Sequence, residues 1–68
     1  MELFKIKGEY IHLNQLLKMM GWAHSGAESN AIIESGEVKV NGEVELRKRN
    51  KIKVGFEIEF KGEMVKIE

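Results

Sequence analysis

The residues best suited to bind a ligand lie in one short segment. Five cations fall within seven positions that contain no acid: Arg47, Lys48, Arg49, Lys51 and Lys53. A guanidinium offers phosphate oxygens a planar fork and can stack on a base, whereas an ammonium is a compact point charge. Because clustered cations repel one another unless a polyanion offsets them, the segment predicts an anionic partner.

The rest of the chain is slightly acidic, which makes the 47–53 segment stand out. The net charge is +0, but residues 1–46 carry four basic and seven acidic side chains, and residues 54–68 carry two and four. Three interpretations remain open for the segment. It binds nucleic acid, it docks on an acidic protein partner, or it is a solvated loop whose charges protect a sheet edge from aggregation.

No arrangement of residues predicts catalysis or a metal site. His12 and His24 are the only imidazoles, and without Cys or Asp in the chain they make a poor zinc site. Ser25 follows His24, but a helix cap would occupy its hydroxyl. The seven glycines form no phosphate-cradling or dinucleotide-binding motif. We expect no enzymatic activity, no metal and no cofactor, and we regard His12 as a candidate contact for a phosphate or a base.

Two aromatic residues could stack on unpaired bases, as aromatic side chains do in RNA loops. Trp22 follows Gly21 between two predicted helices, and its size favours packing in a thin core. Tyr10 is expected to keep its hydroxyl at the surface.

Length and composition limit what the chain can be. Its 68 residues leave room for one small domain, residues 1–68, with little spare stability. The absence of Cys excludes disulfides, and no apolar run approaches the roughly 20 residues of a membrane-spanning helix. The first residues lack the pattern of a secretory leader. We therefore expect a cytoplasmic monomer that does not bind membranes.

Apolar periodicity predicts a short strand and a helix at the start of the chain. Residues 3–7 alternate apolar and cationic side chains, which indicates a strand. Helical spacing then predicts a helix that ends at Gly21, with Lys18 on its solvent side. The buried stripe of this helix is predicted to be Leu13, Leu16, Leu17 and Met20.

A second helix is predicted between Ser25 and Gly36. Ser25 and Glu28 form a capping box, in which Ser25 accepts from the amide of Glu28 and Glu28 reaches back to the amide of Ser25. Gly36 is typical of a helix end. The predicted buried stripe of this helix consists of Ala27, Ala31 and Ile32.

The apolar period then changes from 3.6 to 2, which predicts two hairpins. Asn41-Gly42 marks the first turn. A three-residue loop with Gly42 at positive φ sets Val40 opposite Val44, whereas a two-residue turn sets Val40 opposite Glu43. We predict the longer loop, because it keeps apolar residues on one face.

The second hairpin is predicted to turn at Lys61-Gly62. Its apolar pairs would be Ile58 with Val65 and Phe56 with Ile67. The order strand, helix, helix, hairpin, cationic segment, hairpin predicts an α+β fold, in which two helices pack on one face of a small, mainly antiparallel sheet.

Residues 12–60 resemble a known family. A leucine-rich helix is followed at fixed steps by Ser, Ala, Ile and Gly, and then by Val-x-Val-Asn-Gly. The matching residues are Leu13, Leu16, Leu17, Ser25, Ala31, Ile33, Gly36, Val38, Val40, Asn41 and Gly42. This pattern resembles the S-four RNA-binding domain, also called the alpha-L motif. With the cations at 47–49, the chain is most similar to the small stand-alone bacterial members.

The resemblance implies a non-catalytic module that binds structured RNA, ribosomal or other, across the helix pair and the adjoining hairpin. Family members usually carry basic residues where this chain has His12, Gly26 and Asn30, so the cationic segment would have to supply that charge. The candidate RNA contacts are Lys18, Ser25, Lys39, Asn41, Arg47, Lys48, Arg49, Lys51 and Lys53. The alternative is a protein interaction module that uses the same segment on an acidic partner.

Overall fold

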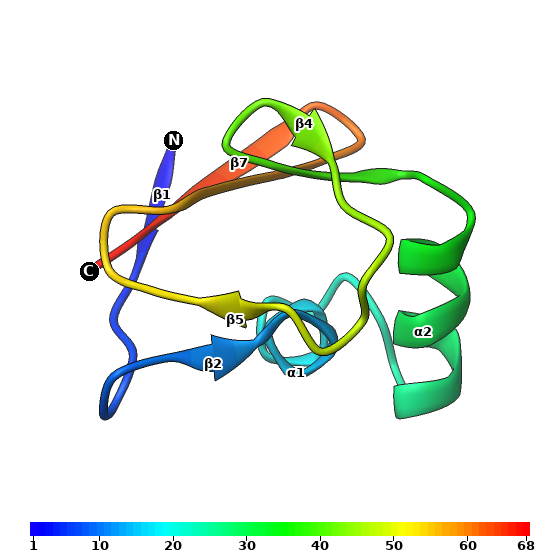
Figure 1. Cartoon of the computed structure of the whole chain (residues 1–68), viewed down its shortest axis with the longest axis horizontal. Coiled ribbons are helices and arrows are strands. Elements are labelled where there is room, and N and C mark those ends of the chain that lie inside the picture. The colour runs from blue at the N-terminus through cyan, green and yellow to red at the C-terminus, as the bar shows by residue number, and fades with distance from the viewer.

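The chain folds into seven short strands and two helices, and the computed structural model describes residues 1–68 (Figure 1). The strands are β1 (Glu2–Phe4), β2 (Ile11–His12), β3 (Val38–Val40), β4 (Glu43–Val44), β5 (Lys51–Ile52), β6 (Glu57–Phe60) and β7 (Glu63–Ile67). The helices are α1 (Leu13–Met19) and α2 (Gly26–Glu34). Five strands form one sheet in the order β1-β7-β6-β3-β4, and β2 pairs with β5 in a separate ribbon.

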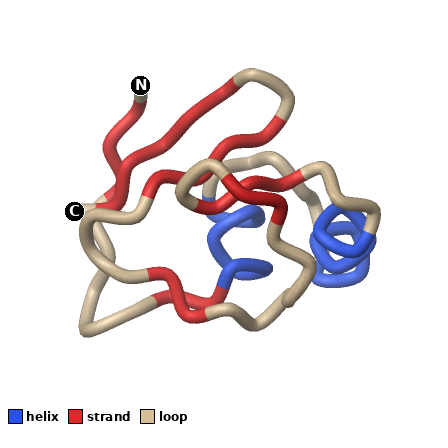
Figure 2. Tube along the Cα trace, turned by 45° about the horizontal axis from the view of Figure 1, so that its top comes forward, coloured by secondary structure: helices blue, strands red, loops and turns tan.

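The sheet covers α1, with the β2–β5 ribbon beside the start of α1 and α2 at one end of the molecule (Figures 1 and 2). The buried apolar residues between these elements are Ile6, Leu13, Leu16, Leu17, Ala23, Ile33, Val38, Val40, Ile52, Ile58, Phe60, Val65 and Ile67. β4 contributes none of them. Only the β1–β7 pairing is parallel. The predicted α+β fold, with two helices packed on a mainly antiparallel sheet, is confirmed.

The first helix buries three of the four residues of the stripe that its spacing predicts. Its fully buried side chains are Leu13, Leu16 and Leu17. Met20 is half-buried just beyond the helix, and Lys18 is exposed. Gly21 follows with a φ of +77°, a conformation that strains any residue with a Cβ. The glycine therefore ends the helix where the sequence predicts.

The cap of α2 agrees with the prediction in one half only. Ser25 Oγ accepts a hydrogen bond from the Glu28 amide at 3.1 Å, as predicted. The Glu28 carboxylate accepts from the amide of His24, at 2.6 Å, and not from that of Ser25. The reciprocal bond thus lies one residue earlier in the chain.

The buried stripe predicted for α2 is wrong. The residues that the structure leaves exposed or half-buried are Ala27, Ala31 and Ile32. Ser29 and Ile33 are fully buried instead. Ser29 Oγ donates to the Asn14 carbonyl at 2.6 Å, so a small polar residue makes the close approach to α1. An apolar pattern cannot indicate this, because the buried hydroxyl is satisfied by a partner in another helix.

The predicted three-residue loop between β3 and β4 is also wrong. Val40 pairs with Glu43, and the two turn residues Asn41 and Gly42 have φ values of +53° and +86°. Positive φ at both positions is typical of the type I′ turn that Asn-Gly favours. Val44 remains exposed, because β3 finds its apolar partners in β6 on its other side. Of this prediction, only the positive φ of Gly42 is confirmed.

The last hairpin has the predicted register. Ile58 pairs with Val65, and the Ile67 amide donates to the Phe56 carbonyl at 2.9 Å. The strand predicted for residues 3–7 is shorter and starts earlier, at Glu2, as β1. The chain leaves the sheet after β1, and buried Ile6 joins the core.

Trp22 packs in the core as predicted. Its ring is half-buried and lies 5.6 Å from that of Phe60, measured between centroids. Neither α1 nor α2 has the length and apolar character that a membrane crossing requires.

Candidate functional site

The segment that follows β4 and ends with the first residue of β5, residues 45–51, is called the cationic loop here. Hydrogen bonds to Glu45 hold it in shape. The Glu45 carboxylate accepts from the Arg47 amide at 3.0 Å, from Arg47 Nε at 2.9 Å and from Arg47 Nη2 at 3.2 Å. It also accepts from Asn50 Nδ2 at 2.9 Å. Because two of these bonds come from one guanidinium in a fork, they fix the plane of the Arg47 side chain.

The cationic loop also caps the start of α1. His12, at the N-cap, provides no side-chain hydrogen bond. Instead, the Leu13 amide donates to the Asn50 carbonyl at 3.0 Å and the Asn14 amide donates to the Lys48 carbonyl at 2.9 Å. The first amides of a helix have no partner within it, so the loop carbonyls replace a capping side chain. The loop therefore has a fixed position against the helix, as its path past α1 shows (Figure 1).

Three of the predicted RNA contacts face a common space. Arg47, Arg49 and Lys51 line a shallow hollow of about 370 Å³ together with Asn50. The Arg47 side chain is 78% exposed although Glu45 holds it. Arg49 and Lys51 are exposed and form no ion pair. The hollow therefore presents donors and positive charge to solvent.

The other two cations of the segment lie at its sides. Lys48 Nζ is 3.8 Å from the carboxylate of Glu34 on α2, and both side chains are largely exposed. An exposed pair at that distance contributes little to stability, so Lys48 can exchange its partner. Lys53 is exposed just after β5 and forms no ion pair.

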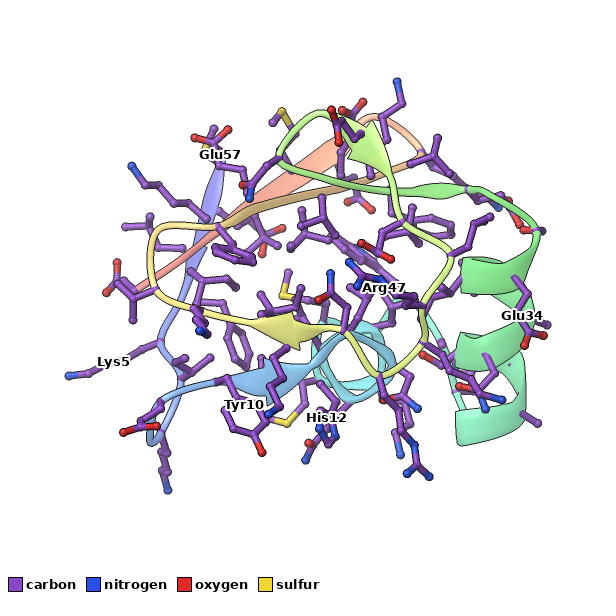
Figure 3. All side chains as sticks on the ribbon, viewed as in Figure 1. Lys5, Tyr10, His12, Glu34, Arg47 and Glu57 are labelled. Atoms are coloured by element: carbon purple, nitrogen blue, oxygen red, sulfur yellow. The ribbon has the colours of Figure 1, made fainter.

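The β2–β5 ribbon extends this surface to two aromatic side chains. His12 is opposite Lys51 in the ribbon. Lys51 Nζ lies 5.0 Å from the centroid of the Tyr10 ring, and that ring lies 5.4 Å from the ring of His12. Tyr10 is 39% exposed, which agrees with its predicted surface position. Figure 3 shows Tyr10 and His12 together on the side of the molecule that the ribbon forms.

Two of the remaining candidate residues have structural partners. Asn41 Oδ1 accepts from the Glu57 amide at 2.9 Å and so ties the β3–β4 turn to β6. Ser25 caps α2.

The last two candidates are exposed lysines outside the loop. Lys39 is opposite Glu59 in the sheet, on the face away from buried Val38 and Val40. Lys18 lies on the solvent side of α1. The structure thus brings together the cationic loop and the start of α1, and it leaves Lys39 on the outer face of the sheet.

Asn14 and Asn30 join the two helices beside the cationic loop. Asn14 Nδ2 donates to Asn30 Oδ1 at 3.1 Å. The resemblance implies a basic residue at the position of Asn30, but here the Asn30 side chain bonds to the other helix. The charge of this surface therefore comes from the loop.

Two residues that organise the loop, Glu45 and Asn50, are not among the RNA contacts that the sequence predicts. In the sequence, Glu45 fits the polar position of a strand. The spacing of Glu45, two residues before Arg47 at the end of a predicted hairpin, can indicate such a role, because a side chain there can bond to its own loop.

The ionisation of Glu45 links the shape of the loop to pH. The hydrogen bond from the Arg47 side chain holds the pKa of Glu45 below its usual range, and Glu45 in turn raises the pKa of Arg47. A carboxylate with a lowered pKa stabilises the fold above its unfolded-state pKa, and this contribution is lost as the pH falls through the folded-state value.

We expect Glu45→Gln to reduce the free energy of unfolding by roughly 1 kcal/mol near pH 7, because an amide can neither pair with the guanidinium nor accept all four bonds. The difference from the wild type should shrink as the pH falls below about 4.3. Urea unfolding at pH values from neutral to acidic measures it. Glu43→Gln, which removes an exposed carboxylate of β4, is the control, and a deficit in Glu45→Gln that does not change with pH would contradict this account.

These features define a small α+β module in which the cationic loop lies against the start of the first of two packed helices. The family model of the S4 domain matches residues 4–68, so the chain belongs to the S4 domain family. The resemblance noted in the sequence is thereby confirmed.

Similar proteins are known from bacteria. YbcJ of Escherichia coli (strain K12) is 44% identical over 61 residues, which cover 90% of this chain and 87% of that protein. YbcJ of Shigella flexneri matches to the same extent. The solution structure of YbcJ from E. coli, described as revealing an alfaL motif involved in RNA-binding, has a TM-score of 0.73 and 43% identity to this chain. That match covers 98% of this chain and 86% of the other.

Proposed function

We propose that this chain binds structured RNA, ribosomal or other, through the cationic loop and the adjoining start of α1. One observation carries the proposal. A loop fixed by Glu45 and by two amides of α1 presents Arg47, Arg49 and Lys51 on one hollow surface. Donors held in position bind phosphates at a smaller cost in side-chain entropy than mobile ones.

The role proposed for each residue follows from its surroundings. Glu45 fixes the plane of the Arg47 guanidinium, which keeps free N–H groups for a phosphate. Arg49 and Lys51 form no ion pair that a phosphate would have to break. Lys48 and Lys53 add charge at the sides. The candidates proposed at the margins are Lys18, Ser25, Lys39 and Asn41.

The relatives support this proposal. The E. coli YbcJ structure, with the same fold, is described as containing a motif involved in RNA-binding. We propose that this chain acts in the same way, as a non-catalytic cytoplasmic monomer. Its target is structured RNA, because the loop and helix start form a fixed surface that suits a fixed array of phosphates.

A salt titration tests the proposal. Four or five phosphate contacts predict that the logarithm of RNA affinity falls with the logarithm of salt concentration with a slope of about −3 to −4.5. Arg49→Ala should make the slope shallower by about 0.7 to 0.9 and weaken binding about fivefold near 0.15 M salt. Fluorescence anisotropy with a labelled RNA hairpin measures both quantities.

Lys66→Ala is the matched control, because it removes one exposed cation from β7, which β6 separates from β3 and β4 in the sheet. The proposal fails if the two variants behave alike, or if affinity does not depend on salt. It also fails if partners captured by the protein survive nuclease treatment, which would indicate an acidic protein instead.

A further inference from the structure

Tyr10 lines a second hollow next to the cationic loop. This hollow, of about 290 Å³, lies between the chain that follows β1 and the outer side of α1. Its apolar wall includes Tyr10, Ile11 and Met19. Met19 is 59% exposed and Tyr10 39%. Apolar side chains that remain exposed around a hollow are typical of a surface that a ligand covers.

The rim of the same hollow is polar and positively charged. Lys5 and Lys7 line it and form no ion pair, and Lys5 extends outward into solvent (Figure 3). Gln15, on the first turns of α1, contributes an amide that can both donate and accept. Two acids adjoin this segment, Glu9 in the sequence and Glu68 through backbone hydrogen bonds to Phe4 and Ile6, and neither is among the lining residues. An apolar wall with a cationic rim is complementary to a nucleotide, which combines a flat base with a phosphate.

Tyr10 connects this hollow to the cationic loop. Lys51, which lines the hollow of the loop, also places its Nζ 5.0 Å from the centroid of the Tyr10 ring. An RNA strand with one phosphate at Lys51 would therefore meet the Tyr10 ring next. Bases within an A-form duplex are stacked and paired, so only an unpaired base can turn toward a protein ring.

We propose that the hollow beside Tyr10 receives one unpaired nucleotide of the bound RNA. The base packs against Tyr10 and Met19, with Gln15 at its edge and its phosphate toward Lys7 or Lys51. This inference rests on the proposed RNA binding and adds to it a preference for RNA in which an unpaired nucleotide adjoins a stem.

The test compares two forms of one RNA duplex, made of two strands that pair fully along the stem and leave no loop. In one form, three unpaired uridines extend each end of the stem, and in the other the same extensions are abasic, with the phosphates kept and the bases removed. Wild-type protein should bind the form with bases about 5-fold to 150-fold more tightly, the range that stacking of one base on an aromatic ring produces. Tyr10→Phe should keep this ratio, and Tyr10→Ala or Met19→Glu should bring it close to one.

The outcomes distinguish the nucleotide site beside Tyr10 from the RNA binding on which it rests. Equal affinity of the wild type for the two forms would overturn the nucleotide site and leave RNA binding by the loop intact. Failure of both forms and of the blunt duplex to bind would overturn the proposed function itself. Val54→Ala, which truncates another exposed apolar side chain, should leave the ratio unchanged, and a loss there would also count against the site.

Discussion

Replacing Arg47, Lys48 and Arg49 together with Ala should weaken binding of a structured RNA about 100-fold near 0.15 M salt. Each neutralised phosphate contributes about 0.9 times the logarithm of the inverse salt concentration, which is about fivefold at this ionic strength. Three contacts therefore multiply to about 100-fold. Anisotropy titrations of the wild type and the variant with one RNA hairpin measure the loss.

The fold should survive this triple substitution. Lys48 and Glu34 form only a long, exposed pair, and Arg47 pairs with Glu45 from an exposed position, where an ion pair contributes little to stability. The double variant Lys61→Ala and Lys66→Ala is the control, because it removes exposed cations from the β6–β7 hairpin. Equal losses per cation in the two variants, or no loss in the triple variant, would show that the loop is not the binding surface.

Ile33→Ala should bring the domain close to its unfolding midpoint at 25 °C. Ile33 is fully buried where α2 meets the core, and truncation of such a side chain costs about 2–5 kcal/mol. A core of this size supplies only about 3–5 kcal/mol of net stability. Urea unfolding followed by the fluorescence of Trp22, which packs on Phe60, measures the change.

The matched control is Ile32→Ala, on the same helix but half-buried. It should cost clearly less, because less of its surface leaves water on folding. If both variants lose the same free energy, the packing of α2 described here is incorrect.

Local patterns predicted the parts of the fold whose partners are close in sequence. The leucine spacing of α1 and the register of the β6–β7 hairpin depend on neighbours within a few residues. The β3–β4 turn does not, because Val38 and Val40 pack beside Phe60 and Ile58 of β6. Pairing Val38 and Val40 with apolar residues of β4 therefore predicted a three-residue loop in place of the observed two-residue turn. The prediction of the buried stripe of α2 was wrong because the partner of Ser29, the Asn14 carbonyl, also lies far away in the sequence, on the other helix.

The candidate site was predictable as a set of charges but not as a surface. The density of cations at 47–53 is visible in the sequence. Their arrangement depends on Glu45 and on backbone carbonyls that reach α1, and backbone contacts leave no mark on residue type. The sequence also does not indicate that Lys51 lies over the Tyr10 ring, because backbone pairing in the two-residue β2–β5 ribbon brings these distant residues together.

The capping of α1 by loop carbonyls has a mechanical consequence. The first turn of this helix can fray only when the loop detaches, because the amides of Leu13 and Asn14 are held by Asn50 and Lys48. Loop and helix therefore open as one cooperative unit. An anion that binds the loop alone therefore also slows the opening of the first turn of α1.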